Sequence, residues 1–292
     1  MLPPSTACCN QLLFDLLCQP VSIRIERLAP LARALHAGQP PLLADLPAAG
    51  SEDPLPWECP LYTVEGGIAI LTISGTMVKG CDAFTCWLFG LASIDRLQLA
   101  LAEISARDDV AAVVLNIDSG GGMTMGTPEL GDAVAALAAQ KFVVAFTSGM
   151  ACSAAYWTAC AASLVVSTRS AMVGSIGTFI AVYDFSEMFA DMGIKVDVIK
   201  RGAFKGMFTP GTSLTDEQRA WLDAQIGRIN DSFTSFVRAH RGAVADSTMQ
   251  GQWFDGEQAV ALGLVDRVVS GLPEVLATLR ASLNQSIATA RF

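Results

Sequence analysis

Ser153 is a serine at a position suited to a nucleophile. It lies in the small-residue run 150–157, after a predicted strand (Phe142 to Phe146) and a Ser148-Gly149 break. A turn between a strand and a helix exposes the serine oxygen, and the helix start supplies backbone N–H donors. The plainer interpretation is a packing serine whose hydroxyl bonds a helix carbonyl. Ser153 therefore indicates a catalytic nucleophile only if other groups of an active site accompany it.

The second such feature is the glycine cluster Gly120-Gly121-Gly122, which follows a predicted buried strand and precedes a helix. Glycines there let amide N–H groups face outward and hold an anion. A phosphate cradle is one use, but neither the dinucleotide pattern nor the Gly-Lys-Ser/Thr pattern is present. An oxyanion hole is the other use, and losing one of its donors costs about 3–4 kcal/mol of transition-state stabilisation. A simple tight turn also fits.

A base to accept the serine proton is scarce in this chain. His36 and His240 are its two histidines, and neither has a site-like neighbourhood. A lysine base must be one of Lys79, Lys141, Lys195, Lys200 or Lys205. Lys205 lies in an apolar, glycine-flanked loop, between Phe204 and Phe208, where low-dielectric surroundings would hold the amine uncharged. The alternative is a surface lysine whose stem covers apolar side chains.

These residues need an α/β scaffold, and the hydrophobic pattern predicts one from Gly66 onward. Strand-like runs alternate with helix-like runs, which is typical of a sheet with substantial parallel pairing. Thr127 is a candidate helix cap, with Pro128 in the first turn. The predicted strands are 68–73, 110–117, 142–146, 164–167 and 195–199, and the predicted helices are 94–106, 128–140 and 215–240.

The chain is expected to divide near residue 60. Residues 1–60 read as an N-terminal helical extension followed by a connector with prolines at 40, 41, 47, 54, 56 and 60. Such a density of proline removes backbone donors and favours an extended chain. Residues 61–292 then form the main domain.

Composition excludes several classes of function. A net charge of −9 and the absence of Lys/Arg clusters argue against a nucleic-acid surface. The uncharged stretch 142–168 is long enough to cross a bilayer, but its internal break favours a buried strand-turn-helix-strand unit. The eight cysteines match no metal spacing, and no basic signal-peptide start is visible. We therefore expect a cytoplasmic protein with reduced thiols, no membrane span, no metal and no cofactor.

Several ordered motifs give the chain, from about Gly66 to Val269, a resemblance to the S49 peptidase family. That family includes signal peptide peptidase A and the protein C-like capsid-maturation proteases of tailed phages, and the N-terminal pattern looks more like the phage members. The motifs are Gly67-Ile68-Ala69-Ile70-Leu71-Thr72-Ile73-Ser74-Gly75-Thr76, Asp118-Ser119-Gly120-Gly121-Gly122, Cys152-Ser153-Ala154, Gly174-Ser175-Ile176-Gly177, Gly202-Ala203-Phe204-Lys205 and Phe254-Asp255-Gly256-Glu257-Gln258-Ala259.

The resemblance implies a role for each matching position. Ser153 matches the nucleophile, Lys205 the general base, and Ser175 a serine that orients the lysine. Gly121 or Gly122 matches one oxyanion donor, alongside the amide of Ser153 or Ala154, and the sequence leaves both choices open.

Two positions depart from the family pattern. Gly120 stands where the family usually has proline, which makes the glycine loop more flexible but keeps its donors. Ala155 stands where cellular members often have glycine, which would reshape the substrate groove.

The resemblance also implies a ClpP/crotonase-like fold of ββα units and a homo-oligomer whose dyad can cross subunits. The predicted function is a serine endopeptidase with a Ser-Lys dyad, encoded by a phage or prophage and cleaving scaffold or other capsid proteins in the host cytoplasm or prohead. Three alternatives stay open at this point: a housekeeping peptidase that degrades signal peptides, a crotonase-like acyl-thioester enzyme, and a structural assembly protein with a decayed site.

Overall fold

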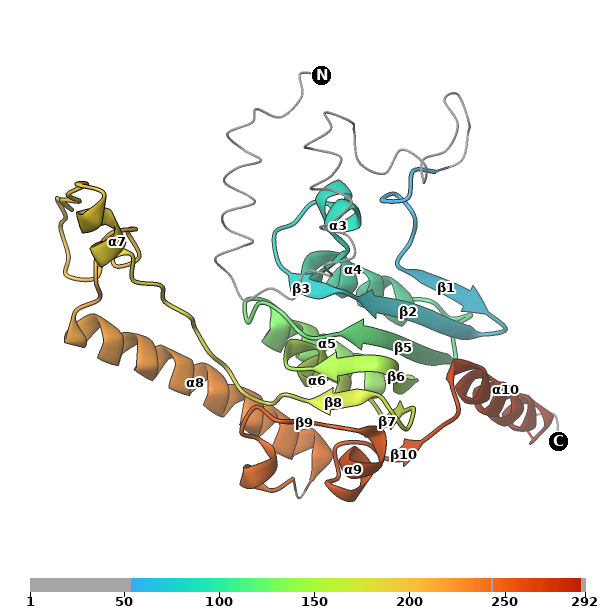
Figure 1. The fold of residues 1–292 in the computed structure, drawn as a ribbon. Helices are drawn as coiled ribbons and strands as arrows, with labels where there is room; N and C mark the ends of the chain where they lie inside the picture. The colour runs from blue at the N-terminus through green and yellow to red at the C-terminus, as the bar shows by residue number, and fades with distance from the viewer. Residues whose placement is uncertain (1–53, 243, 290–292) are drawn as a thin grey trace. The chain divides into compact units, whose positions relative to one another are not determined.

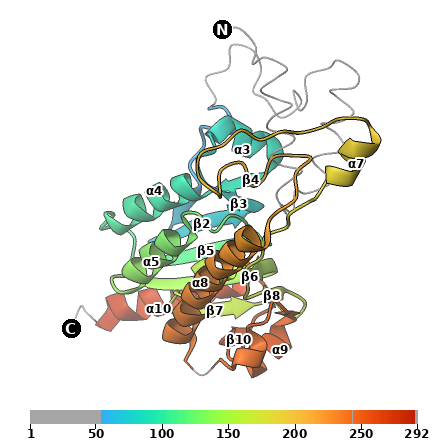
Figure 2. The ribbon, with the colours of Figure 1, turned by 90° about the vertical axis from the view of Figure 1, so that its left-hand side faces the viewer.

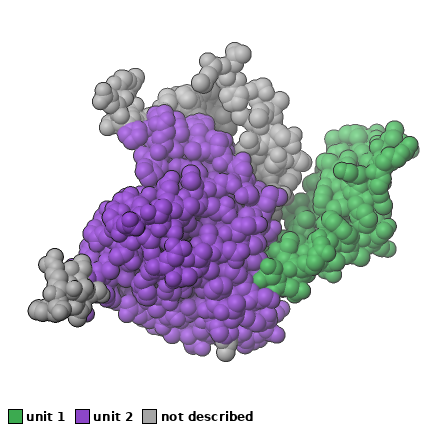
Figure 3. All heavy atoms as spheres, turned by 180° about the vertical axis from the view of Figure 1, so that it is seen from behind, with its two compact units in different colours: residues 1–20, 178–232 green, residues 21–177, 233–292 purple. Residues whose placement is uncertain are grey.

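The computed structural model describes residues 54–242 and 244–289, so the predicted N-terminal helices lie outside the described residues. The chain divides into two compact units (Figure 3). Among the described residues, the smaller unit comprises 178–232, and the larger unit comprises the rest. The larger unit contains every strand found in the described residues.

An eight-stranded, mostly parallel sheet forms the centre of the larger unit (Figure 1). Its main path runs in the order β1-β2-β5-β6-β7-β10, and only the β1–β2 pair on this path is antiparallel. Strands β8 and β9 extend it beside β6. The central strands are continuous apolar runs because both of their faces are covered. Their bounds are β1 Tyr62–Glu65, β2 Ile68–Ser74, β5 Ala112–Ser119, β6 Phe142–Cys152, β7 Leu164–Ser167, β8 Met172–Gly174, β9 Trp253–Phe254 and β10 Arg267–Val268.

Helices cover both faces of this sheet. Helix α10 (Leu272–Thr289) packs through Val275 and Leu279 against Val114, Phe146 and their neighbours on one face. Three helices contact the sheet through strands β2, β5 and β6, and two of them, α4 and α5, run side by side (Figure 2). They are α4 (Ile94–Ser105), α5 (Thr127–Ala138) and α6 (Ala154–Ala159).

Smaller elements complete the described chain. A two-stranded parallel sheet, β3 (Thr76–Val78) with β4 (Leu91–Ser93), flanks the main sheet, and α3 (Ala83–Phe89) connects its strands. Helix α9 (Gly256–Ala261) begins with a capping box at Asp255. The smaller unit contains α7 (Ser186–Asp191) and the first part of α8 (Asp216–Arg241), a helix that continues into the larger unit.

The predicted strands and helices of the larger unit are confirmed, with two local differences, and one prediction in the smaller unit is wrong. In the smaller unit, the predicted strand 195–199 has no regular structure and pairs with no strand among the described residues. Gly126, with φ 83°, caps α5, whereas Thr127 bonds back to the Met123 carbonyl. Strand β6 runs six residues beyond Phe146, through the expected break to Cys152.

The uncharged stretch 142–168 folds as the predicted strand-turn-helix-strand unit, formed by β6, α6 and β7. Within the described ranges, the helices are all too short or too polar to cross a bilayer.

Candidate active site

Ser153 lies in the sharp turn between β6 and α6, as the sequence predicts. Its backbone has φ 53° and ψ −124°, and it is the N-cap position of α6. Among the described residues other than glycine, Ser153 and Ser175 are the ones with a positive φ. A non-glycine residue in such a conformation stores about 1–3 kcal/mol of strain, and these residues cluster at functional sites. Ser153 is half-buried, so its side chain is accessible.

The glycine loop packs directly against this turn. A Cβ added to Gly121 would lie 2.7 Å from the Ser153 Cβ and 2.9 Å from the Ala154 nitrogen. Gly121 also has φ 100°, a region that strongly favours glycine. Only a residue without a side chain lets the loop approach the serine this closely.

The hydrogen bonds of the glycine loop show which of its N–H groups already have an acceptor. The Gly121 N–H donates to Ser119 Oγ at 3.1 Å. The Gly121 carbonyl accepts from the Met77 N–H at 2.9 Å, and the Met77 carbonyl accepts from the Met123 N–H at 2.9 Å. In a parallel bridge of this kind, the residue between the two bonds turns its own N–H to the opposite side. Gly122 is that residue, it is exposed, and its N–H has no acceptor in the part of the chain that the structure describes.

Of the backbone N–H groups around Ser153, one likewise has an acceptor and another has none. The Ser153 N–H donates to the Gly174 carbonyl at 2.8 Å, which continues the pairing of β6 with β8. Ala154 is the first residue of α6, so its N–H has no acceptor within the helix. The free donors next to Ser153 are therefore those of Gly122 and Ala154.

Ser175 follows directly after β8, beside the nucleophile strand. Its φ is 50°, and its N–H donates to the Gln252 carbonyl at 2.6 Å. Since Gly174 accepts from Ser153, the two serines with positive φ are linked through a single backbone bond. Both predicted serine positions are thus brought together at one edge of the sheet.

An irregularity in the sheet shapes the end of β6. Opposite the single residue Asp118 of β5, strand β6 has three residues, 148–150. The Asp118 carboxylate fills the space beside Gly149, where a Cβ would lie 2.3 Å from its Oδ1, and it accepts from the Met150 N–H at 3.3 Å. This bulge lets β6 leave β7 and pair with β8 before it reaches Ser153.

Lys205 belongs to the smaller unit, in the turn 201–208. Its side chain is exposed, and so are the flanking Phe204 and Phe208. The expected burial of the amine against these rings is therefore wrong for the single chain, because both rings face outward. Other lysines are engaged elsewhere: Lys79 pairs with Asp95 at 2.6 Å, and Lys141 bonds two backbone carbonyls.

The surroundings of His240, the alternative base, and of Cys152, the thiol beside Ser153, do not suit either group to catalysis. His240 is exposed at the end of α8, where its ring bonds the Phe236 carbonyl and packs against the Phe236 ring. Burial raises the pKa of the Cys152 thiol to about 11, so it stays neutral near pH 7. His36 lies outside the described residues.

Sequence reasoning missed the residues that hold the glycine loop, namely Ser119 and Met77. Ser119 appears in the family motif, but nothing in the sequence says where its hydroxyl points. A serine between a predicted buried strand and a glycine run is the sequence signal that could have drawn attention to Ser119, which the structure shows to be fully buried.

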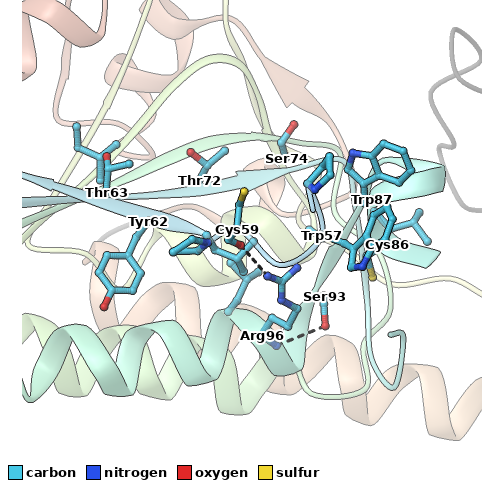
Figure 4. A pocket seen from close by; sticks show the side chains of 17 residues that line it. Trp57, Cys59, Tyr62, Thr63, Thr72, Ser74, Cys86, Trp87, Ser93 and Arg96 are labelled. Atoms are coloured by element: carbon cyan, nitrogen blue, oxygen red, sulfur yellow. Dashed lines mark hydrogen bonds between the residues drawn. The ribbon is translucent and has the colours of Figure 1, made fainter. Parts of the chain in front are cut away.

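The described larger unit also has a pocket of about 340 Å³ between the segment 56–63 and helix α4 (Figure 4). Trp57 and Trp87 lie against each other in its wall, and Arg96, its one charged lining side chain, donates to the Cys59 carbonyl at 3.0 Å. None of the predicted site residues line it.

A serine in a strand-to-helix turn, with a backbone loop packed against that turn, is an arrangement found in α/β serine hydrolases. The sequence model of Peptidase family S49 matches residues 135–285, just over half of the chain. The chain therefore belongs to peptidase family S49, as its motifs indicate.

Individual relatives agree with this membership. The chain is 28% identical to the capsid assembly protease C of Escherichia phage lambda over 78% of this chain and 52% of that protein. It is 30% identical to a putative protease of Methanocaldococcus jannaschii, over 58% of this chain and 55% of the relative. Protease 4 of Salmonella typhi is 26% identical over 69% of this chain and 32% of that protein. The chain spans about half the length of the first two relatives.

Solved structures that resemble the chain include enoyl-CoA hydratases. One from Shewanella pealeana has a TM-score of 0.44 and is 12% identical, covering 76% of this chain and 72% of that chain. The predicted class of a mixed α/β fold with a central, mostly parallel sheet is confirmed by the structure itself.

Proposed function

We propose that the chain is a serine endopeptidase in which Ser153 is the nucleophile and Lys205 the general base. The observation that carries the proposal is the strained backbone of Ser153 in the turn between β6 and α6, with the Gly121 backbone packed against its Cβ. A hydroxyl in such a turn is exposed to a substrate carbonyl while free amides surround it. Family membership adds the class of reaction.

The Ser153 Oγ attacks the carbonyl carbon of the scissile peptide, and its proton passes to the Lys205 Nζ. The carbonyl oxygen becomes an oxyanion, which accepts from the N–H groups of Gly122 and Ala154, the two donors without other acceptors. The C–N bond then breaks, and Lys205 returns the proton to the leaving amine. Water hydrolyses the acyl-enzyme by the same steps. Ser175 orients the lysine, as the family pattern implies.

The exposure of Lys205 in the single chain adds a requirement. A lysine accepts a proton only as the neutral amine, a form that surroundings from which water is excluded favour. We propose that a second copy of the chain covers this surface and excludes water from the amine. Exposed aromatic rings around Lys205 support such a contact: Phe204 and Trp221 pack against each other at 5.6 Å between ring centroids, yet both remain exposed. The functional protein is then a homo-oligomer.

Protein substrates in capsid assembly are the favoured context. Two relatives are named for it, the capsid assembly protease C of phage lambda and the head-tail preconnector protein GP5 of phage P21, each 28% identical over 78% of this chain. We propose cleavage of scaffold or capsid proteins in the host cytoplasm or prohead, without nucleic acid, membrane, metal or cofactor.

Purified wild-type protein and three variants test this proposal with fluorescein-labelled casein and with a fluorophosphonate probe. Ser153→Ala should abolish both casein cleavage and labelling. Lys205→Ala should lower cleavage by at least about 10³-fold, as loss of a base does in related dyads and triads. Lys200→Ala, an exposed lysine of the same segment that bonds the Ala203 carbonyl, is the control and should remain active. Unchanged cleavage by Ser153→Ala or Lys205→Ala rules the mechanism out.

A further inference from the structure

Ser119 is a fully buried serine at the end of β5, immediately before the glycine loop. Buried hydroxyls are costly unless they are hydrogen-bonded. Ser119 satisfies its hydroxyl with two backbone partners: Oγ donates to the Gly75 carbonyl at 2.6 Å and accepts from the Gly121 N–H at 3.1 Å. One side chain thus joins two glycines from different parts of the chain.

Both glycines stand where the backbone has little freedom. Gly75 has φ 88°, and an added Cβ there would lie 1.9 Å from the Gly90 carbonyl oxygen. Its N–H donates to the Asp118 carbonyl at 3.0 Å. The Ser119 hydroxyl therefore ties the glycine loop to a segment that is itself fixed by the main sheet and by the turn before β4.

The loop is held on its other side by β3. Met77 uses its N–H and its carbonyl to bond Gly121 and Met123, so Gly122 has its own N–H on the free side. A Cβ on Gly122 would lie 2.0 Å from the Met77 oxygen, so no larger residue fits between β3 and the loop. The Gly121 N–H and the Gly121 carbonyl belong to the two peptide planes on either side of the Gly121 Cα, and the second of these planes carries the Gly122 N–H. Without the bond from Ser119, the first plane loses its attachment to the fixed Ser119 hydroxyl and can rotate. The Cα that joins the two planes is then held from the Met77 side alone, so the Gly122 N–H is positioned less firmly.

We propose that Ser119 is a positioning residue for the reaction: its hydroxyl occupies the Gly121 N–H and holds the loop so that the Gly122 N–H alone faces the developing oxyanion. Two effects follow. The competing Gly121 donor is removed from the site, and the Gly122 donor is fixed before substrate arrives. The inference rests on the proposed function, because it concerns the oxyanion of that reaction.

Fixed donors act mainly in the transition state, where the carbonyl oxygen gains its charge. Loss of the Ser119 hydroxyl should therefore lower kcat and leave KM nearly unchanged. A purely structural serine would instead lower the melting temperature or the active fraction. Since an inactive fraction also lowers the apparent kcat at constant KM, kcat is expressed per active site, counted from the end point of fluorophosphonate labelling. A fall in kcat per active site at constant KM then distinguishes the positioning role from a structural one.

The experiment compares casein cleavage and the rate of fluorophosphonate labelling for wild type, Ser119→Ala, Ser119→Thr and Ser167→Ala, each assayed well below its melting temperature. Ser167→Ala is the matched control, since Ser167 is also fully buried on a strand, and its hydroxyl has no partner among the described residues. Ser119→Ala should lower kcat and labelling by about 10- to 100-fold at nearly constant KM. Ser119→Thr, which keeps the oxygen, should recover part of this loss, and Ser167→Ala should match wild type.

The inference is overturned if folded Ser119→Ala keeps the wild-type kcat, if its loss lies in KM, or if Ser119→Thr is no better than Ser119→Ala. Failure of the proposed function looks different. In that case the wild-type protein itself does not cleave casein, or Ser153→Ala cleaves it equally well.

Discussion

The backbone N–H of Ser153 donates a 2.8 Å hydrogen bond to the carbonyl oxygen of Gly174. Gly174 is the last residue of β8, so this bond extends the ladder between β6 and β8 to Ser153, the nucleophile candidate. The strained turn at Ser153 is thereby held by the strand that Ser175, the second serine with a positive φ, directly follows. The same hydrogen bond from Ser153 to Gly174 occupies the Ser153 N–H. Of the two amides that the sequence left open, Ser153 and Ala154, only the Ala154 amide remains a candidate oxyanion donor.

The contact between Gly121 and Ser153 makes a substitution test possible. Gly121→Ala forces a Cβ to 2.7 Å from the Ser153 Cβ and to 2.8 Å from the Cys152 carbonyl oxygen. We expect casein cleavage to fall by at least about 100-fold, because displacement of the serine by even an ångström has an effect of that size. Gly80→Ala is the control, since Gly80 has a similar φ of 73° but nothing within 4 Å of its added Cβ. It should lose about 1–2 kcal/mol of stability and keep its activity. Equal activity in the two variants would contradict the proposed site.

The buried thiol beside the nucleophile gives a second prediction. Burial raises the pKa of Cys152 to about 11, so almost no thiolate exists between pH 6 and pH 9. Iodoacetamide at pH 8 should therefore leave casein cleavage intact, and Cys152→Ala should still be labelled by the fluorophosphonate. The control is Cys59, an exposed thiol that iodoacetamide should modify, as peptide mass spectrometry will record. Inactivation that maps to Cys152 would contradict a buried, neutral thiol at this position.

The pair Arg241–Asp266 predicts an acid-sensitive contribution to stability. Burial opposes ionisation of Asp266, but its bidentate bond from Arg241 and the Val165 N–H outweigh burial and lower its pKa. A lowered folded-state pKa stabilises the protein above the unfolded value, about 3.9, and this stability is lost as pH falls through the folded value. Asp266→Asn should cost about 2–4 kcal/mol at pH 7, measured by urea unfolding.

The same comparison at low pH provides the control. As the pH falls through the folded-state pKa of Asp266, the wild-type carboxyl becomes protonated as well, so the difference between wild type and Asp266→Asn should shrink. Asp109→Asn, at an exposed carboxylate paired with Arg107, should leave stability nearly unchanged because water screens such a pair. A difference for Asp266→Asn that stays constant until the wild-type protein unfolds in acid would show that packing, and not charge, explains the loss.

The exposed rings near Lys205 predict an oligomer that depends on them. Wild-type protein should have the mass of a multimer by light scattering, and the double variant Phe204→Ser/Trp221→Ser should shift toward the monomer and lose cleavage activity together. Leu99→Ser, at an exposed apolar residue of α4, should leave both the mass and the activity unchanged. A monomeric wild type that cleaves casein would contradict the covering of Lys205 by a second copy.

Much of the larger unit could be predicted because its strands are continuous apolar runs and the apolar residues of its helices recur at helical spacing. The strand 195–199 was wrong for a physical reason: alternating residues such as Val196 and Val198 favour an extended chain, but a strand also needs a partner for its backbone. The length of β6 was underestimated because Ser148-Gly149 resembles a turn. In the fold it is a bulge, held by Asp118, a residue 30 positions earlier.

The candidate site shows the same limit. The sequence motifs predicted Ser153, Ser175 and the glycines, and the structure brings these together. Which of the Gly121 and Gly122 N–H groups is left without an acceptor among the described residues could not be predicted, because it depends on where the buried Ser119 hydroxyl points. The exposure of Lys205 could not be predicted either, because it depends on how the flanking Phe204 and Phe208 pack, and both remain exposed.

The bulge at residues 148–150 has a consequence for local opening. Up to Thr147, β6 is paired with β5 and β7, whereas from Met150 onward it is paired with the short strand β8 and, at Ala151 alone, with Ser119 of β5. We expect these two stretches of one strand to open separately. In native-state hydrogen exchange, amides 143–146 should exchange only with global unfolding, while amides 150–152 exchange through smaller fluctuations. Such a result would mean that the turn at Ser153 can adjust while the core beneath it stays closed.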